Sequence, residues 1–307
     1  MYNSELKMQY IDDMEYRNVN LRIVMQRYFD RCQKMEEELQ KDVSNFTVVE
    51  IIDFLKSLCL TSFETVLIIN NQMKIYTDYC LNRNLVKDNQ NHFYEITYDI
   101  IKNCTNTALV NEQIVTKDDL FFIINQLQNV SDKFLVLALF EGICGHTMCE
   151  LIDLNMSDFN GNEVTLCTGR KLIVSDKLVS YAKQSTDTYD YVAFTKSGNF
   201  KVFQYDANDK NILKQLYNCR GNSADNKRQR LYNKLVRVRK SLEVNCISTG
   251  ALNESGRINM IREIQKQTGE EDFKECLIKH KEVEAIYGKV FSYSTFMLKY
   301  GEIIERM

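Results

Sequence analysis

The chain contains no proline in 307 residues. Proline makes up about 5% of an average sequence and is the residue that most reliably stops a helix. Helix ends and turns must therefore depend on Asn, Asp, Ser and Gly, and we expect a mostly α-helical protein. A hydrophobic content of 44% with 26% charged residues is typical of a globular chain that buries a core.

The first part of the chain has the spacing of a helical domain. Residues 5–42 look helical, and Thr47 with Glu50 three positions later predicts a capping box at the start of another helix. A further helix or pair of helices should begin at Thr61 or Ser62. The polar stretch KDNQNHFYEITYD then interrupts the pattern. We predict a helical domain over residues 1–110 and a second domain over residues 111–307.

The second domain combines helices with a small antiparallel β-sheet. TKDDLFFIINQLQ and SDKFLVLALFEGI are expected helices, and the second is apolar all round and should be buried. EVTLC and KLIV flank the turn TGR, which predicts a hairpin, and YDYVAF with NFKVFQY adds one or two strands. From Asp209 onward the pattern is helical again, with a break around NCISTG. The predicted fold class is mostly α with a small antiparallel sheet.

Composition excludes several classes of protein. The longest apolar run, FLVLALF, is far shorter than the ~20 residues that a membrane helix needs, and the first residues do not resemble a secretory signal. The ten cysteines are scattered without a C-x-x-C pair. Cys144, His146 and Cys149 lie close together but make a poor zinc site, because they crowd three ligands into six residues. We expect reduced thiols and neither a metal nor a cofactor.

One segment carries a strong positive charge although the whole chain has a net charge of −3. NKRQRLYNKLVRVRK, residues 226–240, contains no acidic residue. Its cationic residues are Lys227, Arg228, Arg230, Lys234, Arg237, Arg239 and Lys240. Leu231, Leu235, Val238 and Leu242 form an apolar stripe, and Arg230, Arg237 and Lys240 should point away from it. A solvated cationic face is the alternative, but the absence of acids favours nucleic-acid binding.

The order of elements resembles the tyrosine recombinase (phage integrase) family. A buried helix precedes GICGHTMCELIDLNMSDF, a hairpin with a basic turn follows, and the last helices end in STFMLKY. The upstream helices, FTVVEIIDFLKSL and LTSFETVLIINNQMKIYTDYC, are similar to the core-binding domain of that family. The resemblance spans roughly residues 45 to 305. It implies a helical core-binding domain followed by a catalytic domain.

The resemblance also assigns the catalytic positions of the family. The first arginine falls on Thr147, the hairpin lysine on Lys171, the histidine and arginine of H-x-x-R on Glu254 and Arg257, the later histidine or tryptophan on Phe291, and the nucleophile on Tyr300. A threonine cannot supply the charge that two arginines normally bring to a phosphate, and Glu254 repels it. The resemblance therefore implies an inactive site.

Several of these residues also have an ordinary structural interpretation. Tyr300 shares an apolar helix face with Phe296 and Ile303, which is typical of a core tyrosine. Arg257 can serve equally as a phosphate contact or in a structural ion pair. Arg170 and Lys171 lie in a turn, where such residues are usually solvated.

The pattern as a whole resembles the MrpR-type lytic-cycle repressors of SPbeta-like phages. The resemblance implies a repressor that binds double-stranded DNA with both domains, in the cytoplasm of a bacterial host and without a membrane, and that answers to a phage-encoded antagonist. Arg170, Lys171, Arg257 and, in the first domain, Lys74 would join the basic segment in contacting DNA. The few residues after Tyr300 favour a monomer.

Two alternatives remain open from the sequence. One is a divergent but active integrase in which Arg262 or Arg170 replaces the missing arginine. The other is an interaction module without any role on DNA.

Overall fold

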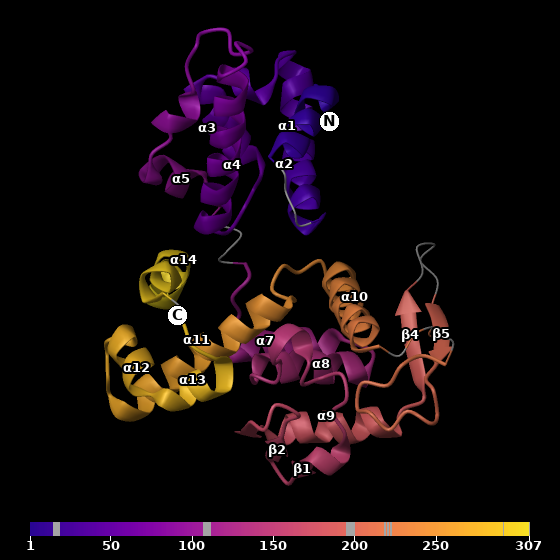
Figure 1. Cartoon of the computed structure of the whole chain (residues 1–307). Coiled ribbons are helices and arrows are strands. Elements are labelled where there is room, and N and C mark those ends of the chain that lie inside the picture. The colour runs from indigo at the N-terminus through magenta and orange to yellow at the C-terminus, as the bar shows by residue number, and fades with distance from the viewer. Residues whose placement is uncertain are drawn as a thin grey trace. The chain divides into compact units, whose positions relative to one another are not determined.

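The chain separates into two compact units, Met1–Val110 and Asn111–Met307 (Figure 1). The structure is a computed structural model, and it describes residues 1–14, 19–106, 112–194, 200–217, 219, 221, 223–290 and 292–306. Helices make up most of both units, and the strands are short and antiparallel. The predicted fold class is thereby confirmed. Each unit buries a hydrophobic core of its own.

The described residues of the first unit form helices only. The α-helices and short 3-10 helices are α1 (Ser4–Asp13), α2 (Val19–Leu39), η1 (Val43–Asn45), α3 (Val48–Ser57), α4 (Phe63–Leu81), η2 (His92–Glu95) and α5 (Tyr98–Cys104). The helical stretch expected over residues 5–42 is therefore two helices. Their separation lets the ring of Tyr10 on α1 meet that of Phe29 on α2 edge-on, at 5.9 Å between centroids.

Polar side chains set the starts of the next helices, as the sequence predicts. The Thr47 hydroxyl accepts the Glu50 amide, and the Glu50 carboxylate accepts the Thr47 amide at 2.7 Å, which confirms the capping box. The Ser62 hydroxyl accepts the amide of Thr65 at the start of α4. Each contact satisfies a backbone donor that would otherwise lack a partner in the first turn.

A buried charged group lies inside the core of the first unit. The Lys7 ammonium is fully buried and donates to Glu36 at 2.5 Å, and it lies 3.7 Å from Asp42. The Tyr76 hydroxyl donates to Asp42 at 3.2 Å. Burial raises the pKa of Glu36, and the nearby Lys7 opposes that rise. Loss of Lys7 would leave the carboxylates of Glu36 and Asp42 buried without their cation.

The second unit contains the remaining helices and all the described strands. They are α7 (Lys117–Gln126), α8 (Val130–Phe140), η3 (His146–Met148), η4 (Met156–Asp158), β1 (Phe159–Asn160), β2 (Glu163–Thr165), β3 (Lys171–Ile173), α9 (Asp176–Asp187), β4 (Asp190–Phe194), β5 (Phe200–Gln204), α10 (Ala224–Leu242), α11 (Thr249–Thr268), α12 (Phe273–Lys279), α13 (Lys281–Tyr287) and α14 (Tyr293–Arg306).

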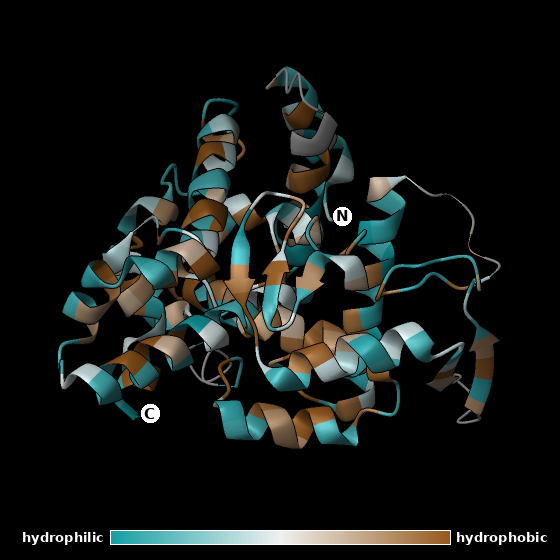
Figure 2. Ribbon diagram, turned by 90° about the horizontal axis from the view of Figure 1, so that it is seen from below, coloured by the Kyte–Doolittle hydropathy of each residue, from teal (hydrophilic) through white to brown (hydrophobic). Residues whose placement is uncertain are grey.

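Helix α8 is the centre of the second core. Every residue from Phe134 to Phe140 is at most 5% exposed, as its all-apolar sequence predicts. The helix packs against α9 and α11 (Figure 1). The hydropathy colouring in Figure 2 alternates along most helices, as expected when one face meets a core and the other meets water.

The predicted hairpin is present, and the one or two further strands expected are a pair, β4 and β5. Val164 of β2 pairs with Leu172 of β3, and Gly169 in the turn between them has a φ of 83°, which favours glycine. Strand β1 extends this sheet on the other side of β2. Tyr191 of β4 pairs with Phe203 of β5 in a separate two-stranded sheet. The turn TKSG between β4 and β5 lies outside the described residues.

Candidate functional site

The glycine-rich segment after α8 makes a tight turn that brings its backbone against another helix. Gly142 has a φ of 89°, and a Cβ atom there would lie 2.5 Å from the Ile286 side chain and 2.9 Å from its carbonyl oxygen. No other residue fits such a contact without movement. Thr147 follows in η3 with a φ of 53°, a left-handed conformation that is rare for a β-branched residue. Its side chain is exposed, and its hydroxyl donates to the His146 carbonyl at 2.7 Å.

Arg170, in the hairpin turn, bonds both to a buried carboxylate and to carbonyls at the end of α13. Its Nε and Nη2 donate to the two oxygens of Glu150 at 2.8 and 2.5 Å. Its Nη1 donates to the carbonyls of Ala285 and Ile286, and Nη2 also reaches Gly142. The expectation of a solvated turn arginine is therefore wrong. The planar guanidinium donates to the carboxylate and to three carbonyls at once. These contacts take the place of solvent around the side chain.

The hydrogen bonds around Glu150 also fix its ionisation. Burial raises its pKa, but the hydrogen bonds from Arg170 and Thr168 together with the charge of Arg170 hold the pKa below its ordinary value. The carboxylate also accepts the amide of Cys144 at 3.1 Å. Glu150 thus holds the turn before Thr147 and the hairpin after it in one arrangement.

Lys171 follows Arg170 but has a different environment. It lies on β3 with its side chain exposed, and its ammonium pairs with Glu163 of β2 at 3.1 Å. A pair of this kind on the surface contributes about 0–1 kcal/mol and exchanges readily with other anions. Lys171 can therefore still reach a phosphate, whereas Arg170 cannot do so without leaving Glu150.

Arg257, Glu254 and Tyr300 come together in the second unit. Arg257 on α11 is 4% exposed, and its Nε lies 3.0 Å from the carboxylate of Glu254. Its terminal nitrogens donate to the carbonyls of Tyr287 at 2.7 Å and Gly288 at 3.0 Å. Arg257 thus forms an ion pair inside the second unit, which is one of the two roles left open for it. Phe291, the remaining position in this part of the chain, lies outside the described residues.

Tyr300 on α14 is buried and electrostatically coupled to this pair. It is 6% exposed, and its ring lies 5.0 Å from that of Phe296. Burial raises the pKa of the Tyr300 phenol, the charge of Glu254 raises it further, and Arg257 opposes both. Burial likewise raises the pKa of Glu254, against the opposing charges of Arg257 and Lys299. These surroundings disfavour the phenolate, the form in which a tyrosine attacks phosphorus.

A glycine beside Arg257 explains how α11 approaches the central helix. A Cβ atom at Gly256 would lie 1.8 Å from the carbonyl oxygen of Phe140, so any side chain would push α11 away from α8. The Tyr287 hydroxyl donates to the same carbonyl at 2.9 Å. The end of α8, the start of α11 and the end of α13 are thereby held together around Arg257.

This arrangement of a helical first unit and a second unit built around α8 matches a known family in both parts. The MrpR C-terminal catalytic domain matches residues 114–289, and the MrpR N-terminal core-binding domain matches residues 1–82. The chain belongs to the MrpR family. The core-binding and catalytic domains of this family also confirm the recombinase-like architecture.

A curated relative of this MrpR-family chain is the SPbeta prophage-derived uncharacterized protein YopR of Bacillus subtilis (strain 168). The two are 24% identical over 283 residues, which cover 88% of this chain and 84% of the relative.

The basic segment of this MrpR-family protein is helix α10, as predicted. The Ser223 hydroxyl caps its start, and Leu231, Leu235 and Val238 are buried against the core. Lys234 was expected among the DNA contacts, but it is buried. It is 7% exposed, its ammonium lies 3.4 Å from Asp132 of α8, and it donates to Ser131 at 2.7 Å. Because Lys234 lies next to Leu231 and Leu235 on the buried side of α10, its side chain points into the core.

Several cations near the start of α10 have partners on the protein. Lys227 pairs with Asp153 at 2.5 Å, and Arg228 pairs with Asp225 at 2.9 Å. Arg230 is half-buried and donates to the Gly221 carbonyl at 2.8 Å and to Gln215 at 3.2 Å. Arg230 therefore does not extend freely from the helix, in contrast to the prediction.

Near the end of α10 the cations are exposed. Arg237, Arg239 and Lys240 are exposed, and in the described part of the chain no carboxylate pairs with any of them. Arg237 lies over the ring of Tyr191 at 5.5 Å. The last two turns of α10 are therefore the part of the predicted basic surface that is open to a nucleic-acid phosphate.

The remaining predicted contacts are constrained by neighbours. The Lys74 ammonium lies over the ring of Tyr94 at 4.7 Å in the first unit. Arg262 donates to Gln265 at 2.9 Å and lies over the Phe273 ring at 5.7 Å.

Across the described residues, no helix is long and apolar enough to span a membrane, and no three His, Cys, Asp or Glu side chains gather as a metal site.

Sequence reasoning missed the residues that hold these groups in place. Glu150 is visible only as part of the E-L motif, and nothing near it in sequence indicates Arg170 as its partner. Asp132, the partner of Lys234, stands in the first turn of α8, just before the apolar run that starts at Phe134, which is a usable signal. A charged residue in such a helix requires a buried counter-charge.

Proposed function

We propose that this protein is a sequence-specific double-stranded DNA-binding repressor that maintains phage lysogeny and uses an inactive tyrosine recombinase scaffold. The observation that carries this proposal is the closed Glu254–Arg257 pair. The only arginine found at a catalytic position of the recombinase family has its charge met by Glu254 and its terminal nitrogens bonded to two carbonyls. The guanidinium is also buried, so these contacts hold it inside the protein and do not present it to a scissile phosphate.

The other catalytic positions support the same conclusion. Thr147 offers a neutral hydroxyl where an arginine would meet the phosphate, and removal of one preorganised donor typically lowers a rate by ~10²–10³. The raised pKa of Tyr300 works against its activation as a nucleophile. Arg170 is bonded to Glu150, and Arg262 donates to Gln265 and lies over the ring of Phe273, so each has a role within the protein, which disfavours it as a substitute. An active but divergent integrase is therefore disfavoured.

DNA binding is supported by charge placement and by family. Cations exposed on the last turns of α10 supply a local positive surface on a chain whose net charge is −3. Lys171 provides another exposed cation on the hairpin. The match to a core-binding domain favours DNA contact by the first unit, and the prophage origin of YopR favours a phage setting.

The proposal includes the assembly and the setting. The apolar face of α14 is buried, with Phe296 stacked on Phe273 at 6.3 Å within the same unit. That face is then unavailable for exchange with another copy, and we expect a monomer that binds one operator in the cytoplasm of a bacterial host. A phage-encoded antagonist would release it.

Selection of bound fragments from a phage genome tests the proposal. The protein should enrich a small set of duplex sites and protect each one from nuclease digestion. A competitor duplex with a scrambled sequence should not displace the selected site at equal concentration. Retention of all fragments alike, or of none, would contradict a sequence-specific repressor.

A further inference from the structure

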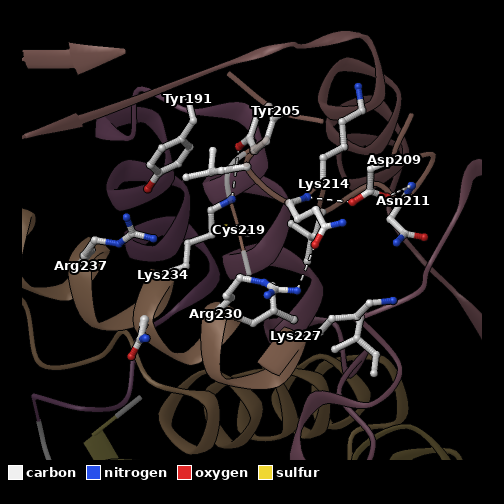
Figure 3. A pocket seen from close by; sticks show the side chains of 16 residues that line it. Tyr191, Tyr205, Asp209, Asn211, Lys214, Cys219, Lys227, Arg230, Lys234 and Arg237 are labelled. Atoms are coloured by element: carbon white, nitrogen blue, oxygen red, sulfur yellow. Dashed lines mark hydrogen bonds between the residues drawn. The ribbon is translucent and has the colours of Figure 1, made fainter. Parts of the chain in front are cut away.

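The second unit contains a pocket that neither the family nor the proposed DNA contact accounts for. Its volume is about 460 Å³, and it lies between α10, strand β4 and the segment that follows β5 (Figure 3). Pockets that hold small ligands usually measure about 300–1,000 Å³, so the space is sufficient for one. Helix α10 supplies four cations to its wall, and the segment after β5 supplies Asp209.

Helix α10 provides one wall of the pocket with a row of cations. Lys227, Arg230, Lys234 and Arg237 follow one another at intervals of three, four and three residues, which places them along one side of the helix. Lys227 is neutralised by Asp153, and Lys234 by Asp132. For Arg230 and Arg237, the described residues include no carboxylate partner. Two positive charges on this wall therefore lack an opposite charge.

The single carboxylate that lines the pocket does not supply that charge. The two oxygens of Asp209 accept the backbone amides of Asn211 at 3.0 Å and Gln215 at 2.9 Å. These hydrogen bonds hold the segment after β5 in its turn, and among the described residues no ion pair joins Asp209 to Arg230 or Arg237. The positive charge of Arg230 and Arg237 thus remains available to a ligand.

Apolar and aromatic side chains form much of the rest of the wall, beside the polar Asn211, Lys214, Gln215 and Asn233. The ring of Tyr191 lies next to Arg237 (Figure 3). Leu213 and Leu231 also line the pocket and contribute hydrocarbon surface. Apolar walls with a few fixed polar groups are typical of small-molecule sites. An aromatic ligand gains from stacking on tyrosine and arginine, and an anionic group gains from the fork of a guanidinium.

We propose that this pocket binds a small ligand that combines an aromatic body with one anionic group, which Arg237 and Arg230 hold. Lys234 is fixed at one side of the pocket by Ser131 and Asp132, so that wall is preorganised. Arg237 is also among the exposed cations proposed to meet DNA. Ligand and DNA then compete for the same guanidinium, a consequence that rests on the proposed function.

Fluorescence titration with 1-anilinonaphthalene-8-sulfonate tests the site directly, because this probe carries an aromatic body and a permanent anion. One probe should bind per chain, and N-phenyl-1-naphthylamine, which lacks the sulfonate, should bind at least tenfold more weakly. Arg237→Gln should lower the affinity for the anionic probe by about tenfold or more, since hydrogen bonds to charged groups are the stronger ones. Lys240→Gln is the matched control on the same helix, outside the pocket, and should leave the affinity unchanged.

The proposal is overturned if the two probes bind equally well, or if Lys240→Gln weakens binding as much as Arg237→Gln. A second titration adds the selected operator duplex. Release of the probe supports competition for Arg237, whereas a ternary complex overturns that competition and leaves the ligand site standing. Failure of the protein to bind any duplex would contradict the proposed function without affecting the result of the probe titration.

Discussion

Glu254 and Arg257 face each other one turn apart on α11, with 3.0 Å between the carboxylate and Nε, while the other end of the same guanidinium holds the carbonyls of Tyr287 and Gly288. The pair thus fastens the end of α13 to α11. In a recombinase these two positions would be the histidine and the arginine that serve a phosphate. Here a carboxylate takes the place of the histidine and lies against the arginine, which under the proposed function makes Arg257 a structural group.

Substitution of Tyr300 by phenylalanine should leave operator binding unchanged. The ring packs on Phe296 in the second unit, and the raised pKa of the phenol disfavours the reactive phenolate. Electrophoretic mobility shift with wild type and Tyr300→Phe, at equal folded concentration by circular dichroism, would measure the effect. Loss of binding by a folded Tyr300→Phe protein would show that the hydroxyl has a function.

Removal of Arg170 should destabilise the second unit far more than removal of its neighbour Lys171. Arg170→Ala leaves the Glu150 carboxylate buried without its cation, which typically costs about 3–5 kcal/mol. Lys171→Ala breaks only an exposed pair with Glu163, for which about 0–1 kcal/mol is usual. Chemical denaturation followed by circular dichroism compares the two free energies of unfolding. Equal losses would mean that the Glu150 hydrogen bonds do not hold the turn.

Charge reversal at Arg237 and Lys240 together should weaken DNA binding and reduce its salt dependence. A plot of the logarithm of the DNA-binding constant against the logarithm of the salt concentration has a slope of about −0.9 for each phosphate that the protein neutralises. Each phosphate contact that the variant loses should therefore make this slope less steep by about 0.9. Arg230 is unsuitable for this test because its hydrogen bonds to Gly221 and Gln215 also support the local fold.

The matched control for that experiment reverses two exposed lysines of α9, Lys177 and Lys183, which changes the net charge equally. It should leave the slope as in the wild type. If both double variants lose affinity alike, net charge alone governs binding and the face of α10 has no special part.

Protonated His92 should stabilise the first unit, and this contribution should be lost as the pH rises from 6.5 through the raised pKa of the imidazole. Hydrogen bonds from the imidazole to Glu95, and then to Asp88, raise its pKa above the ordinary value of 6.5. The folded state then binds more protons than the unfolded state between 6.5 and the raised value. This stabilisation is complete below pH 6.5 and is lost as the pH rises through the raised pKa.

The His92→Gln variant should therefore lose more stability relative to wild type at pH 6 than at pH 9. Denaturation at both pH values measures this difference. NMR titration of the three histidines, with His92→Gln used to assign its signal, measures the pKa itself. A His92 pKa at or below 6.5 would contradict the hydrogen bonds seen here.

Helix starts and hairpins were predictable because their causes are local. The Thr47–Glu50 capping box, the apolar run of α8 and the Gly169 turn each act within a few residues of sequence. The break after α1 was not predictable, because it serves the contact between Tyr10 and Phe29 of different helices.

The surroundings of the candidate site depend on contacts between distant segments. Arg170 and the carbonyls of Ala285 and Ile286 are separated by 115 and 116 residues, and no spacing rule relates them. Lys234 illustrates the same limit within one helix. The charge pattern of α10 is visible in the sequence, but whether a given cation is buried depends on Asp132 across the core. The sequence could identify a basic helix, yet not which of its cations are free.

The most direct test of the claim that this protein binds DNA without cleaving it is an attempt to trap a covalent protein–DNA adduct. The selected operator, prepared as a duplex with a nick near its centre so that a cleaved strand cannot be rejoined, would be incubated with the wild-type protein and resolved in sodium dodecyl sulfate. We predict a complex in the native gel and none in the denaturing gel. A detergent-stable protein–DNA adduct that disappears in Tyr300→Phe would contradict the inactive site.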